Sequence, residues 1–332
     1  MDDLVAKEVI CPVNIYEWAS PIVLVKKPDG AYRMCIDPSR TLNPWLVEDN
    51  YSLPTADQLF VEVRGHAYYS LIDLKGAFQQ LRLSQKASDL VVIVTPFGAY
   101  RYLRLTFGLK TASAVFQRVI DSILKKFQWA KAYIDDIIVY ADSLDEMRAR
   151  LMTLFRVLME HNVKANLSKC IFGAKSLTYL GHVLSKEGIA PTPVRIEEIS
   201  KAKPPKDLKA LESFLGLVSF VRKFIPHLST RAQPLHRLQK ADVKFSWGAL
   251  ENAAFEDVKT ATLTLNFLIH FDPRKQIIIS TNASDVGIAA VLCHEVEAHL
   301  RPIFFKSRTL QPGKTRLFMV LKNSTSLCMA QK

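Results

Sequence analysis

The chain has 332 residues, of which 49% are hydrophobic, so it can form two or three domains with sizeable cores. Its 44 basic and 32 acidic residues give a net charge of +12, which favours a polyanionic partner such as nucleic acid. The five scattered cysteines argue against a disulfide framework or a zinc ribbon, and the lack of a signal-peptide pattern or a membrane-length apolar run predicts an intracellular protein with no membrane partner.

Local patterns predict short strands and helices in a mixed order. IVLVKK and AYRMCID read as two strands around a Pro-Asp-Gly turn, and a helix is expected near Thr55–Val63. Further strands are expected at 68–74 and 91–96, helices at 112–127, 143–163 and 208–225, a hairpin at 177–189, a linker at 200–209, and two strands within 276–295. In the helix at 143–163, the apolar residues at helical spacing are assigned to the core: Leu144, Met147, Leu151, Leu154, Phe155 and Leu158.

Two adjacent aspartates, Asp135 and Asp136, interrupt the apolar, β-prone run YIDDIIVYA. Adjacent aspartates often form a turn, and a hairpin with no further role is one interpretation. The other is a metal site, which needs a third carboxylate, and Asp73 at the end of the predicted strand SLID provides it. Clustered carboxylates repel one another unless divalent cations bind them, and two Mg²⁺ ions can then activate an attacking oxygen and stabilise a leaving one. That is the chemistry of nucleotidyl transfer.

At this point the chain resembles the reverse transcriptases of gypsy-type long-terminal-repeat retrotransposons, over about residues 1–310. WASPIVLVKKPDG and RMCIDPSRTLNPWLVEDNYSLP resemble the fingers, and LIDLKGAFQQL, FGLKTASAVFQ and YIDDIIVYA resemble the polymerase motifs A, B and C. NLSKCIF and YLGHVLSKEGI resemble the motifs that follow, SFLGLVSFVRKFIPHLS the connection, and STNASDVGIAAVL the first hairpin of a ribonuclease H domain. One motif would be weak, but this many in one order is specific.

The resemblance implies roles for the residues that match these motifs. Asp73 and Asp135 would be the main Mg²⁺ ligands and Asp136 an auxiliary acid, and Mn²⁺ would be able to replace Mg²⁺. Lys169 would protonate the leaving pyrophosphate. Contacts with the incoming dNTP would come from Lys27 and Arg33 on the triphosphate, Phe78 as a steric gate against a 2′-hydroxyl, Phe107 and Gly108 under the nucleotide, and Gln117 near the template.

For several of these residues the alternative is structural: solvated charges for Lys27, Arg33 and Lys169, and a core aromatic for Phe78. LGHV, at Leu180–Val183, resembles the primer grip.

Three departures from the family's pattern stand out. Thr106 and Ser113 replace two prolines of motif B, and Ser113 is expected to cap the following helix. Asn282 stands where the family's ribonuclease H has a metal-binding aspartate, and an amide lacks the charge that holds a divalent ion. The C-terminal tail loses the family's pattern, which we interpret as a frameshift near Gly313, and the start looks clipped. We therefore expect no ribonuclease H activity.

The sequence thus predicts an α+β right-hand polymerase, with fingers at about 1–70 and 91–105 and a palm at about 71–90 and 106–186. Domain boundaries are expected at 1–186 for fingers and palm, 187–270 for thumb and connection, and 271–332 for a truncated RNase H-like remnant. The expected activity is RNA- and DNA-directed DNA synthesis, with an RNA template, a DNA primer/template, dNTPs and Mg²⁺, in cytoplasmic virus-like particles or the nucleus. The alternative is a decayed fragment that only binds nucleic acid; a two-metal nuclease is disfavoured.

Overall fold

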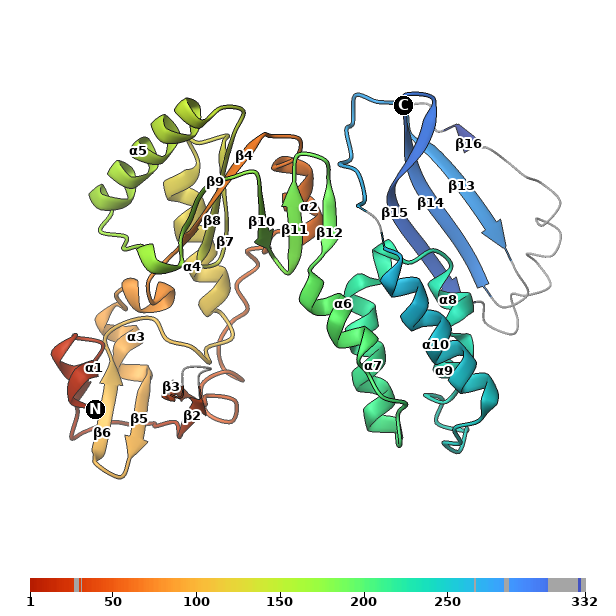
Figure 1. Cartoon of the computed structure of the whole chain (residues 1–332). Helices are drawn as coiled ribbons and strands as arrows, with labels where there is room; N and C mark the ends of the chain where they lie inside the picture. The colour runs from red at the N-terminus through yellow and green to blue at the C-terminus, as the bar shows by residue number, and fades with distance from the viewer. Residues whose placement is uncertain (27–29, 31, 266, 284–286, 310–327, 330–332) are drawn as a thin grey trace. The chain divides into compact units, whose positions relative to one another are not determined.

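The computed structural model describes residues 1–26, 30, 32–265, 267–283, 287–309 and 328–329, and Figure 1 gives the course of the chain. The chain divides into two compact units. The first unit contains residues 1–59 and 67–174, and the second contains residues 60–66 and 175–332. In the described part of the chain, no helix is long and apolar enough to cross a membrane.

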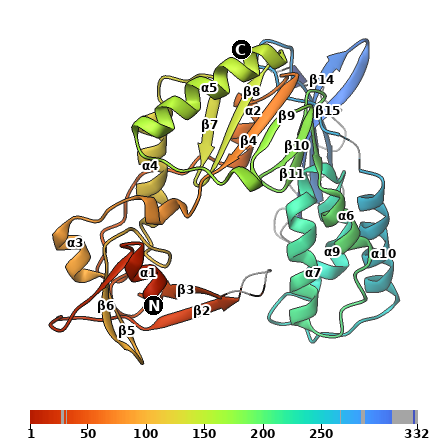
Figure 2. The same ribbon diagram turned by 60° about the vertical axis from the view of Figure 1, so that its left-hand side comes forward.

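The first unit is built around a four-stranded antiparallel sheet in the order β7-β8-β4-β9. Its helix α4 packs against β7, and α5 packs against β8 and β4, as Figure 1 shows. A smaller sheet, β1-β6-β5, and the β2–β3 hairpin complete the unit and are visible together in Figure 2. The elements are α1 (Asp2–Ala6), β1 (Ile10–Pro12), β2 (Ile22–Lys26), β3 (Tyr32–Ile36), β4 (Tyr68–Asp73), η1 (Ala77–Gln80), α3 (Gln85–Leu90), β5 (Val92–Thr95), β6 (Gly98–Tyr102), α4 (Ala112–Leu124), β7 (Ala130–Tyr133), β8 (Asp136–Ala141), α5 (Leu144–Glu160), η2 (Leu167–Lys169) and β9 (Ile171–Ala174).

The second unit contains a three-stranded sheet, β10-β11-β12, a group of helices, and a four-stranded sheet in the order β15-β14-β13-β16. Helix α2 (Ala56–Glu62) spans the boundary between the two units. The other elements are β10 (Ser176–Tyr179), β11 (His182–Ser185), β12 (Ile189–Pro191), α6 (Pro193–Ser200), α7 (Leu208–Val221), η3 (Arg222–Phe224), α8 (Leu228–Arg231), α9 (Gln233–Arg237), α10 (Ala249–Leu263), β13 (Ile278–Ala283), β14 (Gly287–Val296), β15 (His299–Thr309) and β16 (Cys328–Met329).

Most predicted elements are present, and runs of apolar residues account for them. In β8 all residues after Asp136 are buried, because α5 packs against the strand and β4 and β7 flank it in the sheet. Helix α5 is capped by Ser143, whose hydroxyl accepts a hydrogen bond from the backbone N–H of Glu146 at 3.2 Å. Its stripe buries Met147, Leu154 and Leu158, as predicted.

Three sequence-based expectations need correction. Leu144, the first residue of α5, is 55% exposed, so it is not a core residue. Ser113 is not an N-cap: α4 begins at Ala112, Thr111 precedes it, and Ser113 lies within the first turn. The linker at 200–209 joins α6 to α7 inside the second unit and separates no compact units. The predicted domain boundaries at 186 and 270 stay predictions.

His294, which follows Cys293 on strand β14, has a structural role. His294 is buried, its Nδ1 lies 2.7 Å from the carbonyl oxygen of Gln276, and its Nε2 accepts a hydrogen bond from the backbone N–H of Asp272 at 2.9 Å. Its ring stacks on Phe271 with centroids 5.8 Å apart. Both ring nitrogens of His294 are therefore used within the fold, as expected of a satisfied core histidine.

Candidate functional site

Three aspartates meet where two neighbouring strands of the central sheet end. Asp73 is the last residue of β4 and Asp136 the first of β8, and the antiparallel register pairs them directly. Asp135 lies in the two-residue turn that joins β7 to β8. Its carbonyl oxygen accepts a hydrogen bond from the backbone N–H of Leu74 at 2.8 Å. The backbone positions of all three carboxylates are therefore fixed by one set of strand hydrogen bonds.

The turn itself is strained. Ile134, its first residue, has φ +54°, a left-handed conformation that costs a β-branched side chain more than most. A tight turn with a positive φ at its first position matches the right-handed twist of the flanking strands. Such strain persists only where surrounding contacts enforce it, and it is often found at functional sites.

Gln117 on helix α4 supplies such a contact. Its side chain is fully buried, and its Oε1 accepts a hydrogen bond from the backbone N–H of Ile134 at 2.7 Å. Its Nε2 donates to the carbonyl oxygen of Ala132 at 2.9 Å and to Oδ1 of Asp121 at 3.0 Å. Both ends of the amide are therefore engaged with the hairpin and its own helix. These contacts give Gln117 a positioning role. Its predicted contact near the template stays a prediction.

The network continues beyond the helix. The hydroxyl of Tyr51 donates to Oδ2 of Asp121 at 2.5 Å, and this hydrogen bond raises the pKa of Tyr51 to about 12. Sequence reasoning missed Tyr51 and Asp121, because Tyr51 is 70 positions away from Asp121 and nothing local relates them. The spacing of four between Gln117 and Asp121, which places both on one helix face, was the only available signal.

Electrostatic coupling joins the aspartates. Burial, followed by the charges of Asp135 and Asp73, raises the pKa of Asp136 to about 6, and Lys169 opposes this shift. The Nζ of Lys169 lies 3.8 Å from Oδ2 of Asp73, and the lysine side chain is 68% exposed. The structure therefore brings Asp73, Asp135, Asp136 and Lys169 into one charged cluster, as predicted from the sequence.

The donor set fits a divalent cation in its chemistry, although the side chains do not yet converge. Among the residues that the structure describes, no three His, Cys, Asp or Glu side chains form a group that could hold a metal ion as they stand. Unscreened carboxylates repel one another, and this repulsion adds to burial in raising the pKa of Asp136. Paired antiparallel residues have Cα atoms roughly 4.5–5.5 Å apart, so side-chain rotation is enough to bring Asp73 and Asp136 together.

Phe78 sits in an aromatic cluster under the site. It lies in η1, is 8% exposed, and its ring contacts Phe107 at 4.9 Å and Phe116 at 5.6 Å between centroids. Phe78, the predicted steric gate, and Phe107, predicted to lie under the nucleotide, are thus in contact. Phe78 is also a core residue of the first unit. The alternative interpretation from the sequence, a core aromatic, therefore describes most of the side chain's surface.

Gly108 has a backbone that only glycine adopts easily, with φ +103°. A Cβ added there would lie 2.3 Å from the carbonyl oxygen of Ile36, so the close approach at this position is to strand β3. Asn43 holds the same loop, because its Nδ2 donates to the carbonyl oxygen of Gly108 at 2.9 Å. The predicted contact of Gly108 with the nucleotide stays a prediction.

The remaining predicted residues lie elsewhere. Lys27 is outside the described residues, and Arg33 lies on β3 opposite Val25. The segment at 180–183 belongs to the second unit, where His182 is buried and stacks on Phe220 at 5.0 Å. Asn282 lies on β13, opposite Ala289 of β14, and is exposed.

Comparison with known families gives two matches along the chain. Residues 25–184 match the family described as "Reverse transcriptase (RNA-dependent DNA polymerase)". Residues 247–331 match the family described as "RNase H-like domain found in reverse transcriptase".

Related proteins come from transposons. The transposon Tf2-3 polyprotein of Schizosaccharomyces pombe is 33% identical over 276 residues, which is 82% of this chain and 21% of that protein. The retrovirus-related Pol polyprotein from transposon 297 of Drosophila melanogaster is 33% identical over 328 residues, or 97% of this chain and 30% of that protein. The chain therefore spans less than a third of the length of these curated relatives.

Solved structures confirm the fold class. The foamy viral protease-reverse transcriptase in complex with an RNA/DNA hybrid matches with a TM-score of 0.84 and 23% identity, over 95% of this chain and 42% of that chain. The same protein in complex with dsDNA matches with a TM-score of 0.86 and 23% identity, over 96% of this chain and 68% of that chain. The α+β polymerase architecture with an RNase H-like part, predicted from the sequence, is thus confirmed.

Proposed function

We propose that this chain, whose residues 25–184 form a reverse transcriptase domain, extends the 3′-hydroxyl of a DNA primer with dNTPs on an RNA or a DNA template. The observation that supports this most is the direct pairing of Asp73 with Asp136 beside the Asp135 turn. The three carboxylates have no packing role, because Asp135 is exposed and Asp73 and Asp136 are only half-buried.

In this proposal Asp73 and Asp135 hold two Mg²⁺ ions, or Mn²⁺ in their place, with Asp136 as an auxiliary ligand. The ions, when bound, supply the charge that activates the primer hydroxyl and stabilises the leaving pyrophosphate. Gln117 keeps the turn that carries Asp135 in place through the N–H of Ile134. Lys169, beside Asp73, is the proton donor to the leaving group.

Nucleotide selection is assigned to a second set of residues. Arg33 and Lys27 would bind the triphosphate, where a guanidinium fork and an ammonium suit phosphate oxygens. Phe78, packed on Phe107, would exclude a ribose 2′-hydroxyl. The net charge of +12 suits a duplex held through its phosphates.

The finer assignment is to the gypsy-type group of long-terminal-repeat retrotransposons, and the two polyprotein relatives from transposons support it. Such a protein would act in cytoplasmic virus-like particles or in the nucleus. The ribonuclease H-like part would be inactive, because Asn282 offers a metal no negative charge.

The test is primer extension by the purified chain on an RNA and on a DNA template with Mg²⁺, beside the Asp135→Asn variant. Asparagine keeps the shape of the side chain and removes its charge, so extension is expected from the wild type alone. Equal duplex binding by both proteins, measured by fluorescence anisotropy, shows that the variant is folded. Binding without extension by the wild type would instead support the alternative, a decayed fragment that only binds nucleic acid.

A further inference from the structure

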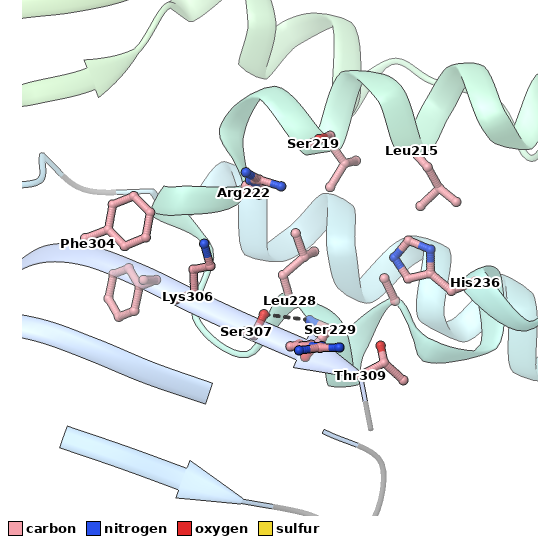
Figure 3. Close-up of a pocket in the computed structure, with 14 residues that line it drawn as sticks. Leu215, Ser219, Arg222, Leu228, Ser229, His236, Phe304, Lys306, Ser307 and Thr309 are labelled. Atoms are coloured by element: carbon pink, nitrogen blue, oxygen red, sulfur yellow. Dashed lines mark hydrogen bonds between the residues drawn. The ribbon is translucent and has the colours of Figure 1, made fainter. Parts of the chain in front are cut away.

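A pocket of about 220 Å³ lies within the second unit. Its walls come from helix α7, the short segments η3, α8 and α9, and strand β15. Strand β15 packs directly against η3 and α8. The hydroxyl of Ser307 on β15 accepts a hydrogen bond from the backbone N–H of Ser229 at 2.9 Å, which ties the strand to α8 (Figure 3).

The pocket is cationic on its polar side. Arg222, Lys306 and Arg308 line it, and none of its described lining residues is acidic. No ion pair or hydrogen bond joins these three side chains to another residue that the structure describes. Several other arginines of the chain, by contrast, have a carboxylate partner within about 3 Å. Figure 3 shows Arg222 and Lys306 beside the same space. Three unpaired cations around one cavity attract an anion.

Ser229 adds an independent observation. Its side chain is 8% exposed and lines the pocket, and its hydroxyl has no hydrogen-bond partner. Buried polar groups are almost always hydrogen-bonded, so an orphaned hydroxyl in the wall of a cavity marks a place where rotation of the side chain lets a ligand atom complete the set. An anionic oxygen is the acceptor that a serine hydroxyl among cations would meet.

Apolar side chains also line the pocket. They are Leu215 and Val218 of α7, Leu228 of α8 and Phe304 of β15. A bare inorganic ion would leave these side chains without a partner, whereas a phosphate ester with an apolar or aromatic portion would use both kinds of lining.

We propose that this pocket binds a phosphate ester of nucleotide size, with the phosphate on Arg222, Lys306, Arg308 and the Ser229 hydroxyl. The phosphate comes either from a free mononucleotide or from a nucleic-acid strand, since both present the same group. The proposal does not rest on the polymerase activity, because the pocket residues and the aspartates are different sets on different compact units.

The experiment compares two double variants that each remove two positive charges from the second unit. Arg222→Gln with Lys306→Gln alters the pocket, and Lys240→Gln with Lys244→Gln is the matched control on exposed lysines outside it. The probe is dTMP in EDTA at low salt, followed by calorimetry with the full chain, with thymidine as the phosphate-free comparison. The wild type and the control are expected to bind dTMP and not thymidine, and the pocket variant to bind at least tenfold more weakly.

Two further measurements make the outcome decisive. Ser229→Ala, which only removes the orphaned hydroxyl, is expected to fold normally and to weaken dTMP binding roughly tenfold. If dTMP does not bind, a salt titration with a 20-base-pair duplex tests the strand as the source. The pocket variant is expected to lower the slope of log K against log salt concentration by about 2 relative to the control.

Equal dTMP binding by the pocket and control variants overturns the proposal. No dTMP binding together with equal salt slopes also overturns it. Primer extension, measured separately, reports on the aspartates alone.

Discussion

The side-chain oxygen of Gln117 accepts a hydrogen bond from the backbone N–H of Ile134 at 2.7 Å, and so connects helix α4 to the turn between two strands. Ile134 is held at φ +54° beside Asp135, whose carboxylate is at the centre of the proposed chemistry. The conformation of the turn that carries Asp135 thus depends on the buried side-chain amide of Gln117. The only charged group that this amide contacts among the described residues is Asp121, on its own helix.

Replacing Gln117 by leucine leaves the N–H of Ile134 and the carbonyl of Ala132 without partners. We expect the free energy of unfolding to fall by about 1–3 kcal/mol. We expect kcat for single-nucleotide incorporation to fall about 10- to 100-fold, because small displacements of a reacting group are costly, while KM for the dNTP changes little. Ser122→Ala, on the exposed side of the same helix, is the control. A loss of rate that only follows the fraction of folded protein would contradict the positioning role.

Phe78 is both a core residue and the proposed gate against ribonucleotides. Phe78→Ala should destabilise the fold by about 3–5 kcal/mol, because it empties a site packed on Phe107 and Phe116. The milder Phe78→Val keeps more of the packing and should raise the incorporation of rNTP relative to dNTP at least tenfold. Competing rNTP and dNTP in single-turnover extension measures this ratio. An unchanged ratio in a folded Phe78→Val protein would leave the residue with its core role alone.

Lys169 has a predicted chemical role that its position permits. Lys169→Met should slow single-turnover incorporation about 10²- to 10⁴-fold without abolishing it, because a proton donor to pyrophosphate is lost while the carboxylates remain. Lys175→Met, at another exposed lysine of the same stretch, should keep the wild-type rate. Equal rates for the two variants would remove Lys169 from the mechanism.

His270 should make the second unit sensitive to acid. Burial lowers the pKa of His270, Arg64 and His66 lower it further, and the hydrogen bond to the carbonyl of Ser185 at 2.7 Å and the charge of Glu187 oppose the shift. The unfolded chain therefore binds more protons than the folded one once the pH falls below about 6.5, so the stability from neutral His270 is present above that pH and is lost below it.

The melting temperature of the wild type should consequently fall between about pH 7.5 and pH 5.5. His270→Gln, which keeps a donor for Ser185 and cannot become charged, should reduce this dependence. His236→Gln, at an exposed histidine, serves as the control. A pH dependence that is the same in all three proteins would rule out His270 as its source.

An RNA/DNA hybrid should remain uncut. Asn282 gives a metal no negative charge, so incubation of a labelled hybrid with Mg²⁺ or Mn²⁺ should produce no RNA fragments while the same preparation extends a primer. Cleavage that disappears in Asn282→Ala would show that an amide suffices at this position.

The sequence predicted what depends on local pattern. Apolar, β-prone runs placed β4 and β8, and the acidic interruption in the second marked Asp135 and Asp136. It did not predict contacts between distant elements. Examples are the hydrogen bond from Tyr51 to Asp121 and the hydrogen bond from Gln117 to the hairpin. Another is the position of Arg222, Lys306 and Ser229 around one cavity. Each of these depends on how distant segments pack, which no local periodicity encodes. The wrong assignment of Ser113 as a cap arose because helix ends are set within one or two residues by competing local contacts.

The pairing of Asp73 with Asp136 also determines which genetic changes this site can survive. Successive residues of a strand point to opposite faces, so deleting or inserting one codon within β4 would turn Asp73 away from its partner while leaving every amino acid of the site in the gene. Substitutions among the apolar neighbours, by contrast, leave the alternation intact. A one-codon insertion or deletion in β4 or β8 would thus be expected to abolish the proposed polymerase activity, even where all three aspartates are still encoded.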